Sequence, residues 1–225
     1  MIENIPLYIP SVFFATVLLT VFFFLKACNQ SRIVLIILLG WIIVQSVIGY
    51  NKIYAVTDSF PPRLIFLIAP PLFLIIFLFI NAKGRKFIDS LDIQWLTLLH
   101  FVRVPVEATL YLLFMQKLIP QIMTFDGNNF DIISGISAPA IAFFGFIQPT
   151  LNKKILILWN IICLALLINI VVTAILSFPF PFQQLAFDQP NIGLLYFPFM
   201  LLPGVIVPLV LFSHLVTIRQ LLIRK

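Results

Sequence analysis

The chain has 225 residues, of which 62% are hydrophobic and 10% are charged, and its mean hydropathy is +1.14. Ordinary soluble domains carry roughly 25% charged residues, so this composition excludes a soluble globular fold and predicts an integral membrane protein surrounded by the lipid bilayer. The net charge of +6 lies in short turns between apolar stretches, where orientation in a membrane explains it. We therefore expect no nucleic-acid partner.

Apolar stretches long enough to cross a bilayer follow one another along the whole chain. A membrane helix needs about 20 apolar residues to span the hydrocarbon core. The stretches that meet this requirement, with short polar turns between them, are residues 5–25, 33–50, 64–80, 93–119, 132–148, 155–177 and 195–221. The sequence therefore predicts an all-α fold, a polytopic transmembrane bundle of about seven spans in a single membrane domain that covers residues 1–225.

The basic residues are distributed unevenly between alternate turns. Ten lie in the turns after the first, third, fifth and seventh stretches: Lys26, Arg32, Lys83, Arg85, Lys86, Lys153, Lys154, Arg219, Arg224 and Lys225. The other turns hold Lys52, Arg63 and Lys117. Because cytoplasmic loops are enriched in Lys and Arg, this asymmetry predicts an outside N-terminus, a cytoplasmic C-terminus and a plasma-membrane location, which is the inner membrane in a bacterium.

The fourth stretch contains three ionisable side chains, His100, Arg103 and Glu107. A charged side chain at the centre of a bilayer costs roughly 2.5–3.5 kcal/mol even on insertion scales, so such residues usually face a partner or a polar cavity. Their spacing of three and four residues places all three on one helix face, which we expect to point into the bundle. At this spacing Arg103 and Glu107 can form an ion pair. Pro105, between them, frees the carbonyl of Phe101 from its helical hydrogen bond.

Other polar residues lie at matching depths in the neighbouring stretches. With a rise of 1.5 Å per residue, His100 and His214 lie about 10 Å from the predicted cytoplasmic ends of their helices, and Asn160 lies slightly closer to its end. Gln45, Glu107 and Asn169 lie about 21 Å from those ends. Two polar layers are therefore expected, and together with Arg103 they form our candidate ligand-binding site: His100, Arg103, Glu107, His214, Gln45, Asn160 and Asn169.

Three functions fit this pattern. The first is a channel, carrier or sensor that binds or conducts a small polar ligand, an ion or a proton, with Glu107 as the titrating group and Arg103 as its counter-charge. The second is a redox or lipid-modifying membrane enzyme in which His100 and His214 act, for example as axial ligands of a b-type haem with Arg103 near a propionate or a quinone. The third is a non-catalytic assembly partner, in which the buried polar groups only hold helices together.

Motifs for common cofactors and reactions are absent from the sequence. It contains no G-x-S-x-G, no H-E-x-x-H, no Walker loop and no dinucleotide fingerprint, so no catalytic residue is assigned. The polar layers hold too few ligands for zinc, which leads us to expect no metal. No cofactor is expected apart from the haem alternative, and no disulfide between Cys28 and Cys163. The sequence does not indicate an oligomeric state.

Two further patterns concern local structure. In the fifth stretch Ser134, Ala138 and Ala142 recur every four residues, which predicts a face for close helix packing. The preceding turn, residues 125–131, is rich in Asp, Asn and Gly, as turns usually are. Asp131, at the end of this turn, is expected to cap the N-terminus of the fifth helix.

Overall fold

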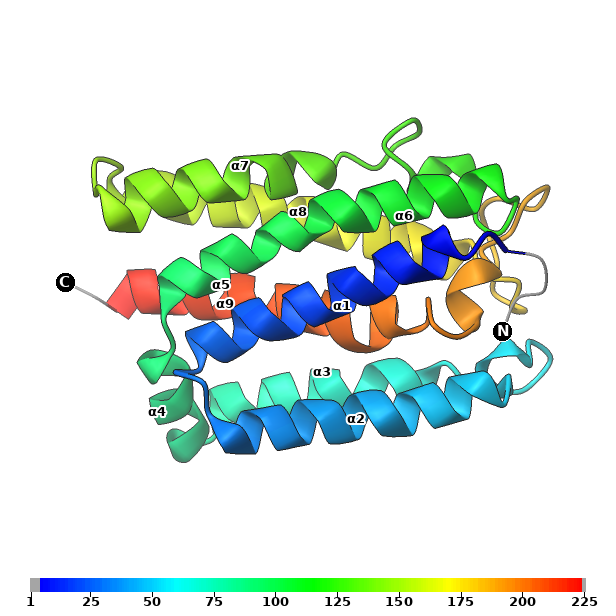
Figure 1. Ribbon diagram of the computed structural model, residues 1–225, viewed down its shortest axis with the longest axis horizontal. Coiled ribbons are helices and arrows are strands. Elements are labelled where there is room, and N and C mark those ends of the chain that lie inside the picture. The colour runs from blue at the N-terminus through cyan, green and yellow to red at the C-terminus, as the bar shows by residue number, and fades with distance from the viewer. Residues whose placement is uncertain (1–4, 224–225) are drawn as a thin grey trace.

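The computed structural model describes residues 5–223, and every regular element among them is helical (Figure 1). This confirms the all-α expectation. The α-helices in this part of the chain are α1 Tyr8–Ala27, α2 Arg32–Tyr50, α3 Ile65–Ile80, α4 Ala82–Ser90, α5 Ile93–Leu99, α6 Arg103–Met115, α7 Ile132–Ala142, α8 Lys153–Leu176 and α9 Val207–Ile223. Short helical turns join or extend them: η1 Ile53–Ala55, η2 His100–Val102, η3 Gln121–Met123, η4 Phe143–Ile147, η5 Gly193–Leu195 and η6 Leu202–Ile206.

Five helical segments within the described residues are long and apolar enough to cross a membrane. They are Tyr8–Ala27, Arg32–Tyr50, Ile93–Met115, Lys153–Leu176 and Leu202–Ile223. A sixth is obtained if α3 and α4, which are bent by 96° at their junction, count as one broken span. The apolar helix Ile132–Ile147 is shorter. The helices therefore indicate a membrane-embedded protein, whereas the number of seven spans stays a prediction.

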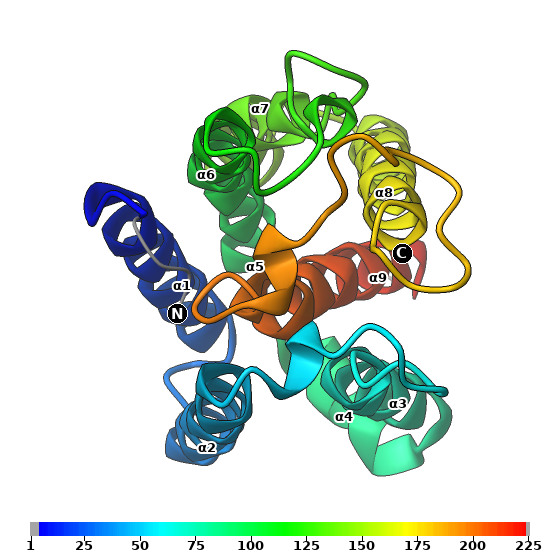
Figure 2. The same ribbon diagram turned by 90° about the vertical axis from the view of Figure 1, so that its right-hand side faces the viewer.

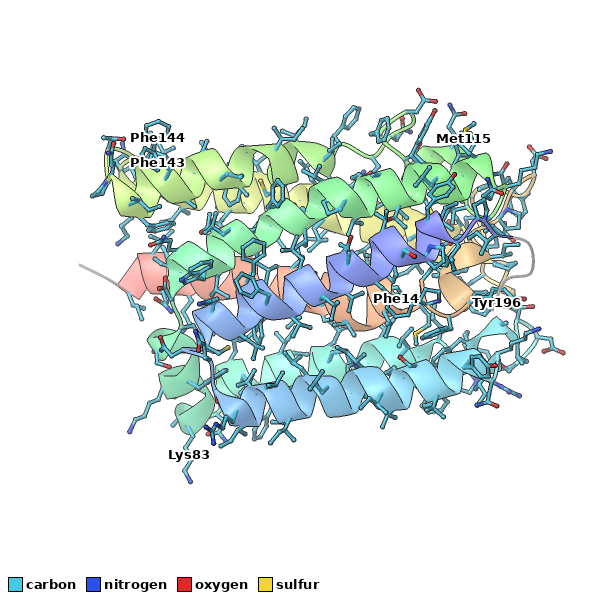
Figure 3. All side chains as sticks on the ribbon, in the orientation of Figure 1. Phe14, Lys83, Met115, Phe143, Phe144 and Tyr196 are labelled. Atoms are coloured by element: carbon cyan, nitrogen blue, oxygen red, sulfur yellow. The ribbon has the colours of Figure 1, made fainter. Side chains whose placement is uncertain are left out.

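The long helices run side by side in alternate directions, so the turns between them gather at two ends of the bundle (Figure 1). The end that carries the C-terminus also carries α4 and the turn between α1 and α2, which brings the basic turns together there. Figure 3 places Lys83, Phe143 and Phe144 at this end and Met115 and Tyr196 at the opposite end. Arg224 and Lys225, which were included in the charge asymmetry, lie outside the described residues.

In the end view α9 lies near the centre of the bundle, while α2 lies at its edge (Figure 2). α9 packs against α5 and α8 and also contacts α3 and α4. In its apolar window 56% of the residues are buried inside the bundle, against 11% for α2. The helices that pack most closely, α1 and α5 to α9, therefore form the core, and α2 is attached to it loosely.

Two expected spans are shorter in the structure because the backbone cannot continue as a helix. The stretch expected to run to residue 119 ends at Met115, because Lys117 adopts a left-handed conformation with φ 58° and the chain turns there. The last span begins at Leu202 instead of residue 195. Pro198 disfavours a helical conformation of Phe197, so a regular helix does not run through residues 195–198.

Proline explains a long-range hydrogen bond between α2 and the last span. Pro208 has no N–H, so it cannot donate to the carbonyl of Gly204 one turn earlier. The indole Nε1–H of Trp41 donates to this carbonyl at 2.9 Å. Gly204 also packs very close to α3, because a Cβ added to it would lie 2.4 Å from Leu67 Cδ1. A side chain from a neighbouring helix thus satisfies the backbone group that the proline leaves free.

The helix α7 begins in the middle of the bundle and not at its end (Figure 1). The chain leaves α6 at one end and returns into the bundle through residues 116–131, where Met123, Thr124 and Asn129 are almost completely buried. Non-helical backbone at such a depth is tolerated where it is buried in protein. This turn is exposed at Phe125, Asp126, Asn128 and Phe130, but its buried residues place polar side chains between α6, α7 and α8.

The hydrogen bond from Trp41 to Gly204 can be tested by a double-mutant cycle. Trp41→Phe removes the indole donor, and we expect it to lower the free energy of unfolding by about 1 kcal/mol. In a Pro208→Ala background residue 208 has its own N–H for the Gly204 carbonyl, so the same change should cost less. Chemical unfolding of the four proteins in detergent measures both costs, and equal costs would contradict this role for Trp41.

Candidate functional site

One continuous helical rod presents the three ionisable residues of the fourth stretch. It consists of α5, the 3₁₀ turn η2 and α6, and its residues His100, Arg103 and Glu107 are 0%, 2% and 1% exposed. The rod tightens just before Pro105, where the Arg103 N–H bonds to the carbonyl of His100 three residues earlier. All three side chains therefore lie on the buried face, within about 10 Å along the helix axis.

Arg103 connects the rod to three other helices. Its Nη1 donates to Asp131 Oδ1 at the start of α7 at 2.9 Å and to the backbone carbonyl of Cys163 in α8 at 3.2 Å. Its Nη2 lies 2.9 Å from Nε2 of His214 in α9. Asp131 is also buried, with a side chain that is 7% exposed. Arg103 and Asp131 thus form a desolvated, hydrogen-bonded ion pair at the junction of four helices.

The hydrogen bonds around His214 determine its tautomer. A guanidinium can only donate, so His214 Nε2 accepts from Arg103 and the ring proton lies on Nδ1. His214 Nδ1 then donates to Asn160 Oδ1 at 2.9 Å, and Asn160 Nδ2 donates to the carbonyl of Leu156 at 2.9 Å. Both ring nitrogens of His214 and both amide atoms of Asn160 thus have partners of the correct kind, and His214 is held as a neutral imidazole.

His100 contacts its neighbours through ring faces and edges only. Its ring stacks on that of His214, with centroids 3.8 Å apart and planes inclined by 18°, and Trp159 packs edge-on against it at 5.6 Å. Neither ring nitrogen of His100 has a hydrogen-bond partner within the described chain, although both are buried. Buried polar atoms without partners are rare and mark either a cost in stability or a function.

The histidine geometry does not fit the haem alternative. Axial ligands approach the iron from opposite faces of the macrocycle, so a haem would have to lie between the two imidazoles. In the structure the two rings are stacked directly on each other. Arg103 also occupies His214 Nε2, one of the nitrogens that would have to bind iron. We therefore derive no chemistry from a haem at this position.

Glu107 is held by a residue of the buried turn and not by Arg103. Asn129 Nδ2 donates to Glu107 Oε1 at 2.5 Å and to the carbonyl of Met123 at 3.0 Å. Asn129 Oδ1 accepts from the Asp131 N–H at 3.1 Å, which links Glu107 to the Arg103–Asp131 pair. Glu107 Oε2 is buried without a hydrogen-bond partner in the described structure. The ion pair expected between Arg103 and Glu107 is therefore not formed, because the guanidinium of Arg103 pairs with Asp131 instead.

These contacts leave the charges of the site unbalanced. The ion pairs found in residues 5–223 are Arg103–Asp131 and, near the basic end, Arg219–Asp89. The buried interior thus has one guanidinium for two carboxyl groups, since His214 is neutral while it accepts from Arg103. With both carboxyl groups ionised the site would carry one uncompensated negative charge, which is costly in a medium of low dielectric constant.

Two residues of the predicted site lie elsewhere. Gln45 is buried in α2, where its Oε1 accepts a hydrogen bond from the hydroxyl of Tyr54. Asn169 is exposed on α8, and its Nδ2 donates to the carbonyl of Asn128 at 3.2 Å. The structure therefore brings together His100, Arg103, His214 and Asn160, with Glu107 joined to them through Asn129. The predicted outer layer of Gln45, Glu107 and Asn169 is not assembled.

The sequence analysis did not assign Asn129 and Asp131 to the site. Asp131 was expected to cap α7, but its side chain makes no capping hydrogen bond and turns toward Arg103 instead. Both residues precede an apolar stretch in a turn of ordinary composition. No feature of the sequence distinguishes this turn, because the apolar stretch that follows it, residues 132–148, is as long as the stretch at residues 64–80.

Comparisons with known proteins do not assign a function to these residues. No family model, no curated protein and no solved structure shows significant similarity to the chain. Within residues 5–223 no group of three or more His, Cys, Asp or Glu side chains lies close enough together to hold a metal ion. A function for these residues is therefore inferred from the geometry of the site.

Removing Arg103 should be far more costly than removing a surface arginine. Arg103→Met leaves Asp131 buried and unpaired, and we expect it to lower the free energy of unfolding by about 3–5 kcal/mol. The double change Arg103→Met/Asp131→Asn removes both charges and should cost much less. Arg219→Gln is the matched control, because its pair with Asp89 is partly exposed and such pairs contribute about 0–1 kcal/mol. Thermal unfolding in detergent compares them, and equal costs for Arg103→Met and Arg219→Gln would contradict the pairing.

Close packing of α7 on the rod can be tested at Gly135. A Cβ at this position would lie 2.9 Å from the backbone nitrogen of Val104 and 3.1 Å from Arg103 Cβ. Gly135→Ala should therefore push α7 away and destabilise the protein by about 1–3 kcal/mol. Gly40→Ala is the control, because nothing lies within 4 Å of its added Cβ and alanine favours a helix. Similar unfolding temperatures for the two variants would show that α7 is not closely packed.

Proposed function

We propose that this chain is a multi-pass plasma-membrane protein that binds a proton at Glu107 and conducts protons, as a channel or as part of a proton-coupled carrier. The proposed topology has seven spans, an outside N-terminus and a cytoplasmic C-terminus. The apolar helices and the basic turns gathered at one end support this topology. In a bacterium the membrane would be the inner membrane.

The proposal rests on the burial and the hydrogen bonding of the Glu107 carboxyl group. Its carboxyl group is 1% exposed, one oxygen accepts from Asn129, and the other has no partner in the described structure. The nearby guanidinium is already paired with Asp131. Binding of one proton to Glu107 makes the site neutral, and its release restores the negative charge. Proton relays in pumps and transporters use buried acids and histidines in this way.

The remaining residues of the site lie on the side of Glu107 that faces the basic end of the bundle. His100 lies seven positions before Glu107, toward the basic end, and neither of its ring nitrogens has a hydrogen-bond partner in the described structure. The Arg103–Asp131 pair lies between the two groups and contributes a fixed field. Arg103 favours the ionised form of Glu107, whereas Asp131 favours the protonated form.

The competing functions make different predictions for the same residue. A redox or lipid-modifying enzyme that uses His100 and His214 would need access to rings that are buried and stacked on each other. An assembly partner would keep its behaviour if Glu107 became neutral, because Gln can still accept a hydrogen bond from Asn129. Neutralisation of Glu107 therefore separates the proton-conducting function from a purely structural one.

The proposal is tested by proton flux into liposomes that contain the purified protein and a pH-sensitive dye, with flux driven by a potassium-diffusion potential. Glu107→Gln keeps the shape of the side chain but cannot bind and release a proton, so we expect the rate to fall roughly tenfold or more. Asp126→Asn is the matched control, because Asp126 is an exposed carboxylate of the neighbouring turn. Equal flux through wild type and Glu107→Gln would refute the proposal.

Proton binding can also be measured without transport. Infrared difference spectra of the wild type between two pH values should contain the carbonyl band of a buried carboxylic acid, and this band should be lost in Glu107→Gln. If the Glu107→Gln and wild-type spectra are identical, Glu107 does not exchange a proton.

A further inference from the structure

An apolar groove lies on the opposite side of α9 from the polar site. It is formed by α2, α3 and the last span, and it has a volume of about 420 Å³. Its walls include Leu38 and Trp41 of α2, Pro71 and Leu74 of α3, and Pro208 of α9. This volume lies in the range of small-molecule sites, about 300–1,000 Å³, but the walls carry almost no polar surface. Such walls suit a hydrocarbon better than a polar molecule.

The groove exists because α2 and α3 do not pack against each other along their length. In Figure 2 the two helices lie apart on the same side of α9. Trp41 connects α2 to the last span through its hydrogen bond to Gly204, which also lines the groove. Pro71 and Pro208, on the facing walls, cannot form regular helical hydrogen bonds through their nitrogens. The groove thus lies between a loosely attached helix and the core.

Cationic residues adjoin the residues that line one end of this groove. Ile33 and Phe87 line it there, and they directly follow Arg32 and Lys86 in the sequence. Arg32, Lys83 and Lys86 are exposed, and neither ion pair in the described residues involves them. Lys83 extends from α4 away from the bundle (Figure 3). The end of the groove is therefore positively charged, and its walls are apolar.

The helix α4 holds these cations at a fixed level. It lies at 96° to α3, across the end of the bundle, as expected for a helix in the plane of a membrane surface. Arg219 of α9 binds both carboxylate oxygens of Asp89 in α4, at 2.9 and 3.0 Å. Gln220 donates to the carbonyls of Ile88 and Leu91, each at 2.8 Å. The anchored α4 thus places Lys83 and Lys86 where lipid headgroups would lie.

We propose that the groove binds one acyl chain of an anionic phospholipid, with the phosphate headgroup between Arg32 and Lys86. The apolar walls accommodate the chain, and the unpaired cations select a negative headgroup over a zwitterionic one. This inference depends on the membrane location in the proposed function but not on proton binding at Glu107. Glu107→Gln should therefore leave lipid binding unchanged.

The test measures quenching of Trp41 fluorescence by brominated lipids. The chain has three tryptophans, so the double change Trp95→Phe/Trp159→Phe leaves Trp41 as the reporter. This protein is placed in phosphatidylcholine nanodiscs that contain brominated phosphatidylglycerol or, at the same mole fraction, brominated phosphatidylcholine. We expect stronger quenching by the phosphatidylglycerol. Arg32→Gln/Lys86→Gln should lower its relative association constant about tenfold.

The control removes two cations from the other end of the bundle. Arg63→Gln/Lys117→Gln changes the net charge equally and should keep the preference for the anionic lipid. Equal quenching by both lipids would mean that only bulk lipid fills the groove, and absence of quenching by either would mean that protein covers it. Either result overturns the proposal. If the tryptophan variant does not fold, native mass spectrometry of the wild-type chain and Arg32→Gln/Lys86→Gln applies the same criterion, through the number of retained phosphatidylglycerol molecules.

Discussion

The interior of this protein depends on the position of one guanidinium group. Arg103 can only donate hydrogen bonds, and its donors bind Asp131 in front of α7, a carbonyl of α8 and a ring nitrogen of α9. These bonds fix the tautomer of His214 and turn Asp131 away from the helix that it would otherwise cap. They also decide that Glu107, four residues after Arg103, has no cationic partner. The arrangement of charges in the site follows from this single residue.

Such a centre requires a helix that ends inside the bundle. Because α7 starts near the middle, residues 116–131 fill the remaining length with turns and the short η3, and Asn129 and Asp131 reach the rod from there. Gly135 allows α7 to approach Arg103 so closely that no side chain fits between them. A full-length helix in this position would have placed Asp131 at the end of the bundle, away from Arg103.

The proposed proton site and the lipid groove use opposite sides of α9. On one side, His214 contributes to a hydrogen-bonded cluster with buried charges. On the other side, Pro208 and Gly204 face an apolar groove and the loosely attached α2. Separation of the two surfaces has a physical reason, since hydrocarbon next to the cluster would remove the polar contacts that make its charges tolerable. The residues α9 presents on its two sides therefore differ sharply in polarity.

The sequence alone determined the all-α architecture, the approximate bounds of the apolar helices and the placement of His100, Arg103 and Glu107 on one buried face, because these depend on hydropathy and helical periodicity within short segments. Tertiary structure decided the partners of those residues. Gln45 and Asn169 have suitable depths, but Gln45 belongs to α2 at the edge of the bundle and Asn169 is exposed on α8, whereas Asn129 and Asp131 were missed because they precede a helix that begins inside the bundle. Depth along a helix can be counted from the sequence, but the rotation of each helix and the path of a buried turn depend on packing between distant segments.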